Sequence, residues 1–330
     1  MKWNHLPKVE LHLHMDTSLS YEGVAQLDPS VTHDDYLRDF AGPEQCADLA
    51  DFLSHVPPII NLLQTEQGLR VLVRDMFRQL VEDHMLYAEL RFAPLQHLER
   101  GLAARDVVRI IEAETAQQIR QTGVEARLIL CSLRHYSGDQ SLETVGLVDD
   151  FRGSLVAGYD LAGDEAGHPL ARHLDSFRYA ADRGIPVTSH AGEASGPQSV
   201  WETLEHIDPP RIGHGVRSIE DPALVQVLKQ KGKHLEICPS CNVQLNVFPN
   251  YASHCLDTLY REGISLGIST DNRTLTPITL NREYDRLSDT FGWGKDDFLR
   301  CNLYALDAAF LPSAVRADLR QKLIAAYERA

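Results

Sequence analysis

The sequence predicts an α/β protein with the architecture of a (β/α)8 barrel (TIM barrel). Two observations support this prediction. Strand candidates and helical segments alternate along the chain, and polar residues follow the strand candidates at their carboxyl ends. Strict alternation favours a parallel sheet, and eight strand–helix units over 330 residues fit a closed barrel. An open doubly wound sheet is the competing architecture, but no glycine-rich phosphate loop follows the first strand candidate.

Eight short runs of apolar and β-branched residues are the strand candidates. Each run is short enough for a strand and is bounded by polar or glycine-containing segments. The runs cover residues 9–16, 86–93, 126–133, 155–162, 185–190, 211–215, 234–239 and 264–270.

Helical segments separate these runs. A long polar and helical excursion over residues 17–64 follows the first strand, and within it Leu49, Phe52 and Val56 have helical spacing. Pro57 and Pro58 should end or redirect that helix. Further helices are expected at residues 65–84, 105–121, 140–152, 173–183, 200–205, 221–231 and 252–262, and in three stretches at the carboxyl-terminal end.

No change of composition and no flexible linker divides the chain, so we expect one domain over residues 1–330. The net charge of −15 argues against nucleic acid or an anionic membrane surface as the main partner. The amino-terminal segment lacks the apolar core of a signal peptide, and no apolar run is long enough to span a bilayer. We therefore expect a cytoplasmic protein.

The six cysteines are widely scattered, which does not suggest a disulfide framework. Cys238 and Cys241 form a Cys-x-x-Cys motif, but no second pair completes a structural zinc site. A redox pair is the alternative. We expect packing and turn residues, because free cysteine behaves as a small buried hydrophobe.

His12 and His14 begin the candidate site. Successive side chains of a strand point to opposite faces, so these two imidazoles lie on one face and can reach one metal ion. Imidazole binds zinc, copper, iron and nickel, so the pair alone does not choose the metal. Two solvated histidines on a strand face are the alternative interpretation.

Polar residues at the ends of the other strand candidates favour a metal site. The carboxyl ends of all strands in a barrel meet at one rim, where such enzymes keep their active sites. Three histidines and an aspartate there make a zinc-binding set with an open position for water, and Glu193 and His214 beside them suit acid–base chemistry. The strand-end residues are His12, His14, Asp16, Gly163, Asp164, Glu165, His190, Glu193, His214, Asp271 and Asn272.

The ordered motifs of the chain resemble the adenosine deaminase family of the amidohydrolase superfamily. They span nearly the whole chain, and the ordered set is highly specific. The motifs are PKVELHLHMD at residues 7–16, HAGE at 190–193, GHG at 213–215 and STDN at 269–272, with DLAGDE at 160–165 and CP at 238–239 in support.

The resemblance implies a hydrolytic deaminase with one zinc ion per chain. The metal would lower the pKa of a bound water so that hydroxide exists near neutral pH. His214 and Asp271 would orient and deprotonate that water, and Glu193 would protonate N1 of the purine. Ammonia then leaves and inosine remains. The implied metal ligands are His12, His14, His190 and Asp271.

The resemblance also implies how a purine nucleoside binds. Gly163 would let the backbone approach the purine N3 edge, and Asp16 would accept a hydrogen bond from a ribose hydroxyl. The apolar residues resemble a lid over the nucleoside, with packing in the core as the alternative. The implied substrate-contacting residues are His14, Asp16, Gly163, Asn272, Leu49, Phe52 and Val56.

The chain departs from the family pattern at several positions. Many members have two aspartates where this chain has Asp271 and Asn272, and an asparagine can still donate to purine N7 through its amide. Asp-Asn-Arg resembles nucleoside deaminases, whereas adenine deaminases keep Asp-Asp-Pro, so adenosine and 2′-deoxyadenosine are the expected substrates. The TSLS stretch at residues 17–20 is unusual near the ribose end, and Cys241 stands where serine is more usual.

Other functions remain open at this point. A 5′-modified adenosine such as aminodeoxyfutalosine, or free adenine, would be deaminated by the same chemistry. A binuclear amidohydrolase would need a bridging carboxylated lysine, and residues 160–165 contain none. An inactive nucleoside-binding barrel would have lost a ligand or Glu193, but all of these residues are present.

Overall fold

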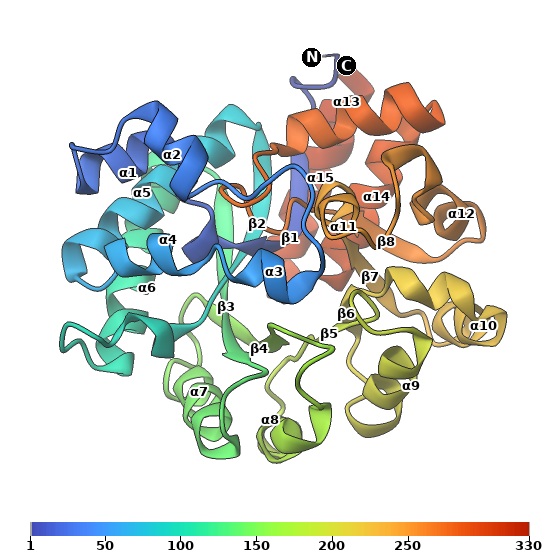
Figure 1. The fold of residues 1–330 in the computed structure, drawn as a ribbon. Coiled ribbons are helices and arrows are strands. Elements are labelled where there is room, and N and C mark those ends of the chain that lie inside the picture. Colours follow the sequence, from blue (N-terminus) through green and yellow to red (C-terminus); the bar gives the residue numbers. More distant parts are fainter. Residues whose placement is uncertain (1, 330) are drawn as a thin grey trace.

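The computed structural model describes residues 2–329, in which eight parallel strands are surrounded by helices (Figure 1). The strands pair in the orders β1–β2–β3–β4 and β5–β6–β7–β8. Their bounds are β1 (Lys8–His14), β2 (Met85–Phe92), β3 (Glu125–Leu133), β4 (Val156–Ala162), β5 (His190–Ala191), β6 (Arg211–His214), β7 (His234–Ile237) and β8 (Ser265–Ile268).

Two isolated parallel bridges join the two sheets. Leu13 pairs with Asp271 between β1 and the end of β8, and Tyr159 of β4 pairs with Val187 ahead of β5. At the first seam the N–H of His14 donates to the carbonyl of Asp271 at 2.6 Å, and the N–H of Asp271 donates to the carbonyl of His12 at 3.1 Å. The predicted (β/α)8 barrel is confirmed, with backbone pairing at the seams limited to these short stretches.

The predicted alternation of strands and helices is also confirmed. Helices α5 to α12 connect consecutive strands, and the three expected carboxyl-terminal helices follow β8. These helices are α5 (Glu66–Glu82), α6 (Ala104–Thr122), α7 (Gly138–Asp150), α8 (Leu174–Arg183), α9 (Pro197–His206), α10 (Pro222–Gln230), α11 (Pro239–Gln244), α12 (Leu256–Arg261), α13 (Leu280–Phe291), α14 (Lys295–Ala308) and α15 (Ser313–Arg329).

Two strands are shorter than predicted. β1 ends at His14, and a 3-10 turn over Met15–Thr17 replaces its predicted last residues, because the Ser18 hydroxyl donates to the carbonyl of His14 at 2.6 Å. The fifth strand was expected at residues 185–190 but is assigned only at His190–Ala191. Pro186, which has no N–H to donate, lies within the missing part.

The excursion after β1 folds into four short helices, namely α1 (Tyr21–Leu27), α2 (His33–Asp39), α3 (Leu49–Leu53) and α4 (Pro57–Leu62). The prediction of one helix carrying Leu49, Phe52 and Val56 was wrong, since Val56 lies between α3 and α4. Pro57 and Pro58 open α4, where a missing N–H costs little. Helix α11 was not predicted, and α12 is shorter than the expected 252–262.

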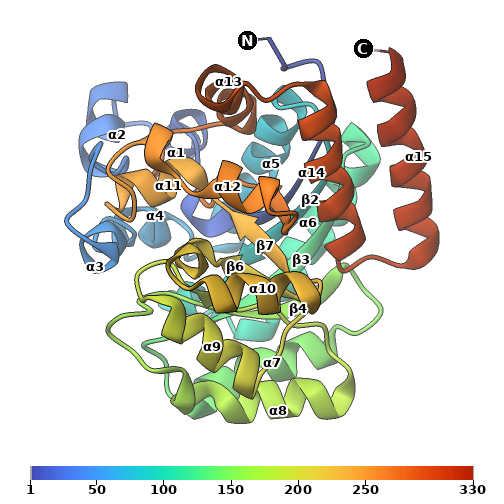
Figure 2. The ribbon, with the colours of Figure 1, turned by 90° about the vertical axis from the view of Figure 1, so that its right-hand side faces the viewer.

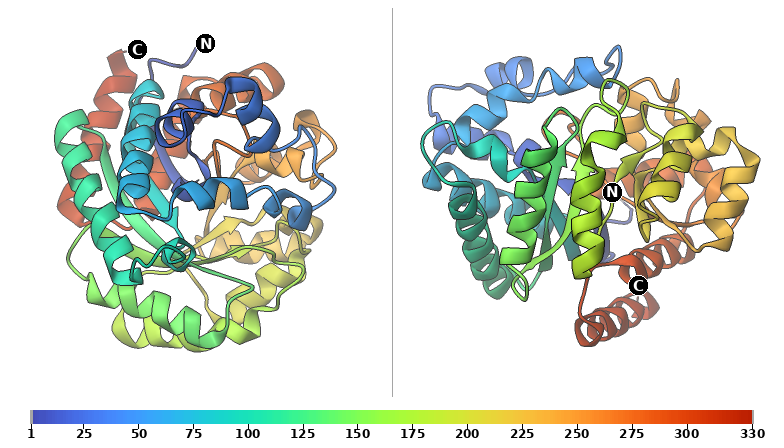
Figure 3. Two further views of the ribbon diagram at one scale, coloured as in Figure 1. Left: turned by 60° about the vertical axis from the view of Figure 1, so that its left-hand side comes forward. Right: turned by 90° about the horizontal axis from the view of Figure 1, so that it is seen from below.

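Helices α3 and α4 lie across the carboxyl ends of the strands and contribute to the wall of the cavity there (Figure 1). In the view from below, the segment with α1–α4 lies across one end of the helices coloured green to yellow (Figure 3). Helix α14 packs against β8 and β1, and α15 lies outside it (Figure 2). Among residues 2–329, no helix has the length and apolar character needed to cross a membrane.

Candidate active site

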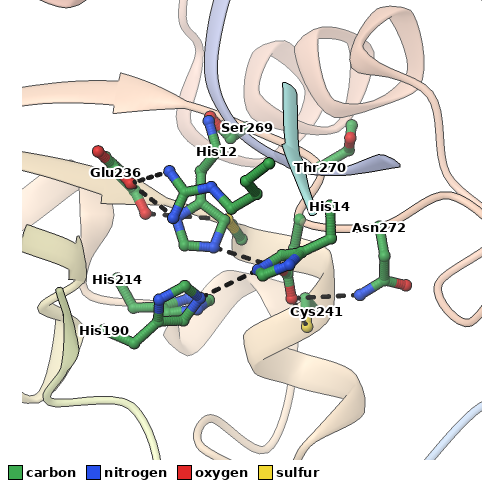
Figure 4. Close-up of polar contacts among 12 residues, drawn as sticks. His12, His14, His190, His214, Glu236, Cys241, Ser269, Thr270 and Asn272 are labelled. Carbon is green, nitrogen blue, oxygen red and sulfur yellow. Dashed lines mark hydrogen bonds and ion pairs between the residues drawn. The ribbon is translucent and has the colours of Figure 1, made fainter. Parts of the chain in front are cut away.

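Four histidines and an aspartate converge at the carboxyl ends of the strands (Figure 4). Possible ligand atoms of four of these side chains lie within 4.8 Å of one another. The fifth side chain, His14, places Nε2 3.1 Å from Nε2 of His190 and 3.6 Å from Oδ1 of Asp271. We call this group the rim cluster: His12, His14, His190, His214 and Asp271.

The backbone at the rim is adapted to this convergence. A Cβ on Gly213 would lie 3.0 Å from Cε1 of His12 and 3.2 Å from Cα of His190, so the glycine lets these residues approach. His214 and Asp271 adopt φ angles of +61° and +66°, which side chains other than glycine rarely do. Strain of this kind concentrates at functional sites.

Buried carboxylates orient two of the imidazoles. His12 donates from Nδ1 to Oε2 of Glu236 at 2.8 Å, and His190 donates from Nδ1 to Oδ1 of Asp160 at 3.2 Å. A histidine that donates from Nδ1 in its neutral form carries a lone pair on Nε2. Both lone pairs therefore face the centre of the rim cluster, as expected of metal ligands supported by carboxylates.

The electrostatics of the rim favour neutral imidazoles. Burial lowers the pKa of His12, His14 and His214 well below the usual value, and neighbouring histidines and Arg91 lower it further. Burial raises the pKa of Asp271. Neutral imidazole is the form that binds metal ions.

The residues present fit a metal ion. Nε2 of His12 is buried without a hydrogen-bond partner among the described residues, although Oδ1 of Asp271 lies 3.2 Å away. Lone pairs of His14 and His190 also face each other at 3.1 Å. Acceptors that converge on one point need a cation, and histidine nitrogens with one carboxylate suit zinc-like ions.

Glu193 lies beside the rim cluster at the end of a relay of hydrogen bonds. The N–H of Leu256 donates to Nδ1 of His254, whose Nε2 then donates to Oδ1 of Asn242 at 3.2 Å. The amide of Asn242 is thereby turned to donate to Oε1 of Glu193 at 2.6 Å. Asn242 and His254 were not predicted, because they come from residues after β7 with no recognisable motif.

The carboxyl group of Glu193 is suited to carry a proton. Burial raises its pKa well above the usual value, and the nearby carboxylates of Asp271 and Glu165 add to this. Glu165 also anchors the loop, since it accepts hydrogen bonds from the N–H groups of Gly192 at 2.6 Å, Glu193 at 3.1 Å and Ser195 at 3.0 Å. The strand-end Glu165 is thus a support for the loop.

Two further residues contact the second oxygen of Asp271. The thiol of Cys241 donates to Oδ2 at 2.9 Å, and the amide of Asn272 donates to it at 3.2 Å. All six cysteines are buried and free, which confirms the expectation that they do not form disulfides. Cys241 differs from a simple packing residue because it contacts the rim cluster.

A cavity of about 690 Å³ opens onto the rim cluster. Its wall includes the three apolar residues predicted as a lid, Leu49, Phe52 and Val56, and the two predicted polar contacts Asp16 and Gly163. Gly163 has a φ of +96°, a conformation that favours glycine. Every side chain predicted to contact substrate, including His14 and Asn272, lies in the wall of this one cavity.

The comparison with known families agrees with this geometry, since the adenosine deaminase profile matches residues 7–326. The chain belongs to the adenosine deaminase family. It is therefore a hydrolytic deaminase, and the resemblance inferred from the motifs is confirmed.

Relatives within the adenosine deaminase family differ in the substrate for which they are named. Adenosine deaminase of Enterococcus faecalis is 33% identical over 328 residues, covering 98% of this chain and 97% of its own. Adenine deaminase of Agrobacterium fabrum is 33% identical over 327 residues, covering 97% and 98%. An amidohydrolase structure from Burkholderia ambifaria with bound zinc shares the fold, with a TM-score of 0.90, 20% identity and coverage of 99% and 92%.

Arg273, the third residue of the Asp-Asn-Arg sequence, has a structural position in this member of the adenosine deaminase family. Its guanidinium is buried and pairs with Glu10 at 2.8 Å and with Asp83 at 2.9 Å. The residue therefore ties β8 to β1 and to the turn before β2.

Proposed function

We propose that the protein is a zinc-dependent deaminase that converts adenosine and 2′-deoxyadenosine to inosine and 2′-deoxyinosine with release of ammonia. The observation that carries this proposal is the convergence of the rim cluster and the buried Glu193 on one cavity. The proposed ligands are His12, His14, His190 and Asp271, with His214 adjacent. A zinc ion bound there would act as a Lewis acid that generates a nucleophile from water near neutral pH.

Glu193 is the proposed proton donor to N1 of the purine. Its Oε1 accepts from Asn242, which leaves Oε2 free to face the substrate, and its raised pKa keeps a proton on the carboxyl group near neutral pH. Protonation of N1 makes C6 electrophilic enough to accept the attacking oxygen. The Nδ1 atom of His214, 3.2 Å from Oε1, lies beside the reaction centre, where this imidazole orients the water together with Asp271.

Asn272 and Gly163 are proposed to bind the purine. The carbonyl oxygen of the Asn272 amide accepts from the N–H of Thr276 at 3.0 Å, so its NH2 group is turned toward the rim cluster and can donate to N7. Gly163, without a side chain, leaves its backbone open to the N3 edge.

The charge of the cavity favours an unphosphorylated substrate. The residues that line it include the carboxylates of Asp16, Glu99 and Asp164, and none of them is lysine or arginine. Phosphate and carboxylate groups are recognised mainly by such cations. A nucleotide, or a nucleoside whose 5′ substituent ends in a carboxylate such as aminodeoxyfutalosine, is therefore disfavoured.

The size of the cavity favours a nucleoside over the free base. A space of about 690 Å³ continues from the rim cluster to Asp16 and to the apolar wall of α3 and α4. Adenine alone would leave this part of the cavity to water and would leave Asp16 without its ribose hydroxyl.

An ultraviolet assay with metal-quantified protein tests the proposal. Adenosine, 2′-deoxyadenosine, adenine and a 5′-substituted adenosine are compared side by side. Conversion of the first two with adenine unchanged is the expected result. Preferred conversion of adenine, or of only the 5′-substituted compound, would contradict the proposed substrate while leaving the deaminase chemistry intact.

A further inference from the structure

The substrate cavity contains a buried hydroxyl group that no described residue satisfies. Tyr136 follows β3, where its N–H donates to the carbonyl of Leu133 at 2.8 Å, and its side chain lines the cavity. The residue is 5% exposed, and its Oη has no hydrogen-bond partner among residues 2–329. Leaving a buried hydroxyl unpaired is unfavourable, so a group that arrives with the ligand is the natural partner.

Asp16 supplies a second open position in the same cavity. Its Oδ2 accepts from the N–H of Ala93 at 2.9 Å and lies 3.6 Å from Nε2 of the buried His97, so this oxygen is turned toward the protein. No described residue makes a hydrogen bond to its Oδ1. One acceptor of the carboxylate is therefore free for a ligand.

The two open groups are close enough to influence each other. Burial raises the pKa of Tyr136 well above the usual value, and the charge of Asp16 contributes to that rise. The phenol consequently stays neutral and can donate, whereas the carboxylate can only accept.

We propose that Tyr136 is a specificity-determining residue that, together with Asp16, binds one hydroxyl of the ribose. This inference rests on the proposed function and names a contact that it does not include. A sugar hydroxyl can donate to Asp16 and at the same time accept from Tyr136. A deoxy position, an alkyl group or a thioether cannot do both, and a phosphate would meet the negative charge of Asp16.

Substitution of Tyr136 with phenylalanine removes the hydroxyl and keeps the ring, which packs edge-on against His135 with ring centroids 4.8 Å apart. We would measure kcat and KM for adenosine and for its 2′-, 3′- and 5′-deoxy analogues. Tyr136→Phe should raise KM for adenosine about 3- to 10-fold with little change in kcat. It should weaken discrimination against one analogue by the same factor, because that analogue already lacks the contact.

A matched control and a second readout separate recognition from a structural role. Tyr179→Phe removes a hydroxyl that donates to Asp149 on the outside of the barrel, and it should change neither constant. The melting temperature of ligand-free Tyr136→Phe should stay the same or rise, since the lost hydroxyl was unpaired. The gain in melting temperature on adding inosine should be smaller than in the wild type.

Two results would overturn the inference. In the first, Tyr136→Phe discriminates against all three deoxy analogues as strongly as the wild type does. In the second, the ligand-free variant melts lower and KM rises equally for all four substrates, which indicates a structural role. Absence of wild-type turnover of every adenosine would instead overturn the proposed function, and this inference with it.

Discussion

Two groups of charged and polar side chains are buried in this barrel, and they differ in how their hydrogen-bonding needs are met. The rim cluster lies at the carboxyl ends of the strands. The second group fills the barrel interior below it and is completely buried. We call it the interior cluster: Glu89, Arg91, Asp160, Arg211 and Glu236.

The interior cluster is balanced by the protein itself. Arg91 donates to Asp160 at 2.8 Å and to Glu236 at 2.7 Å, and Arg211 pairs with Glu236 at 2.8 Å and with Glu89. Each carboxylate thus faces at least one guanidinium. The rim cluster contains no guanidinium or ammonium group, and its imidazole lone pairs face one another and a carboxylate.

The difference teaches which cluster is complete. Buried ions are tolerated when they are paired and hydrogen-bonded. The interior cluster meets this condition, whereas the rim cluster meets it only with an added cation. The two are also joined, since Asp160 and Glu236 of the interior cluster orient His190 and His12 of the rim cluster.

Removal of the metal should separate the two clusters most strongly. Protein stripped with a chelator should lose essentially all deaminase activity, and equimolar zinc should restore it. Because the metal binds only the folded rim, stripping should also lower the free energy of unfolding, by roughly 3–4 kcal/mol if free zinc had been about 100 to 1,000 times its dissociation constant. Metal analysis, the ultraviolet assay and urea unfolding measure these effects. Full activity in protein without metal would break the comparison.

Glu193→Gln should leave the rim cluster intact and remove the proton donor beside it. A glutamine can still accept from Asn242 but cannot protonate N1, so turnover should fall about 10²- to 10⁴-fold or more. The metal content should remain that of the wild type. Glu205→Gln, at an exposed position of α9, is the matched control and should be fully active. Near wild-type turnover by Glu193→Gln would exclude the proposed role.

Arg91→Met tests whether the interior cluster is complete because its charges are paired. The substitution leaves Asp160 without a cation and Glu236 with one fewer, and breaking a buried pair of this kind costs about 3–5 kcal/mol of unfolding free energy. Zinc affinity should also fall about 10- to 100-fold, since both carboxylates orient metal ligands. Urea unfolding and competition with a chromogenic chelator measure the two effects.

The control for Arg91→Met is Arg320→Met, which removes an exposed ion pair with Asp307. Solvent screens such a pair, so neither stability nor zinc affinity should change measurably. Unchanged zinc affinity in Arg91→Met would mean that the two clusters act independently.

The rim cluster could be predicted from the sequence, whereas the interior cluster could not. His12, His14, His190 and Asp271 occur in short motifs at strand ends, and the barrel brings strand ends together whatever the details of packing. Arg91 and Glu236 lie inside strands at positions without a motif. Their pairing depends on the register between strands distant in sequence, which periodicity does not specify.

Local chemistry also explains the errors in the predicted elements. The helical spacing of Leu49, Phe52 and Val56 was genuine, but Pro57 starts a new helix and leaves Val56 between two helices. All three still reach the cavity, because packing against the barrel positions both α3 and α4. Asn242 and His254 were missed because their function is to orient Glu193, and such a contact appears only in three dimensions.

A smaller effect is expected at a buried histidine that belongs to neither cluster. His234, at the start of β7, bonds through Nδ1 to the hydroxyl of Ser265 at 2.9 Å. Burial, with a contribution from Arg211, lowers its pKa to about 3. The folded protein therefore resists protonation of this ring between pH 6.5 and 3, while the unfolded chain accepts the proton. Stability from this group is fully present above pH 6.5 and declines as the pH falls toward 3.

His234→Gln should remove this contribution while retaining a polar partner for Ser265. Between pH 7 and pH 5 the unfolding free energy of the wild type should fall about 2 kcal/mol further than that of the variant. Urea unfolding at both pH values measures the difference, and His206→Gln, at an exposed position of α9, should behave as the wild type. An equal loss in His234→Gln would mean that the acid sensitivity of the barrel lies in its rim histidines, where a bound metal, and not burial alone, opposes protonation.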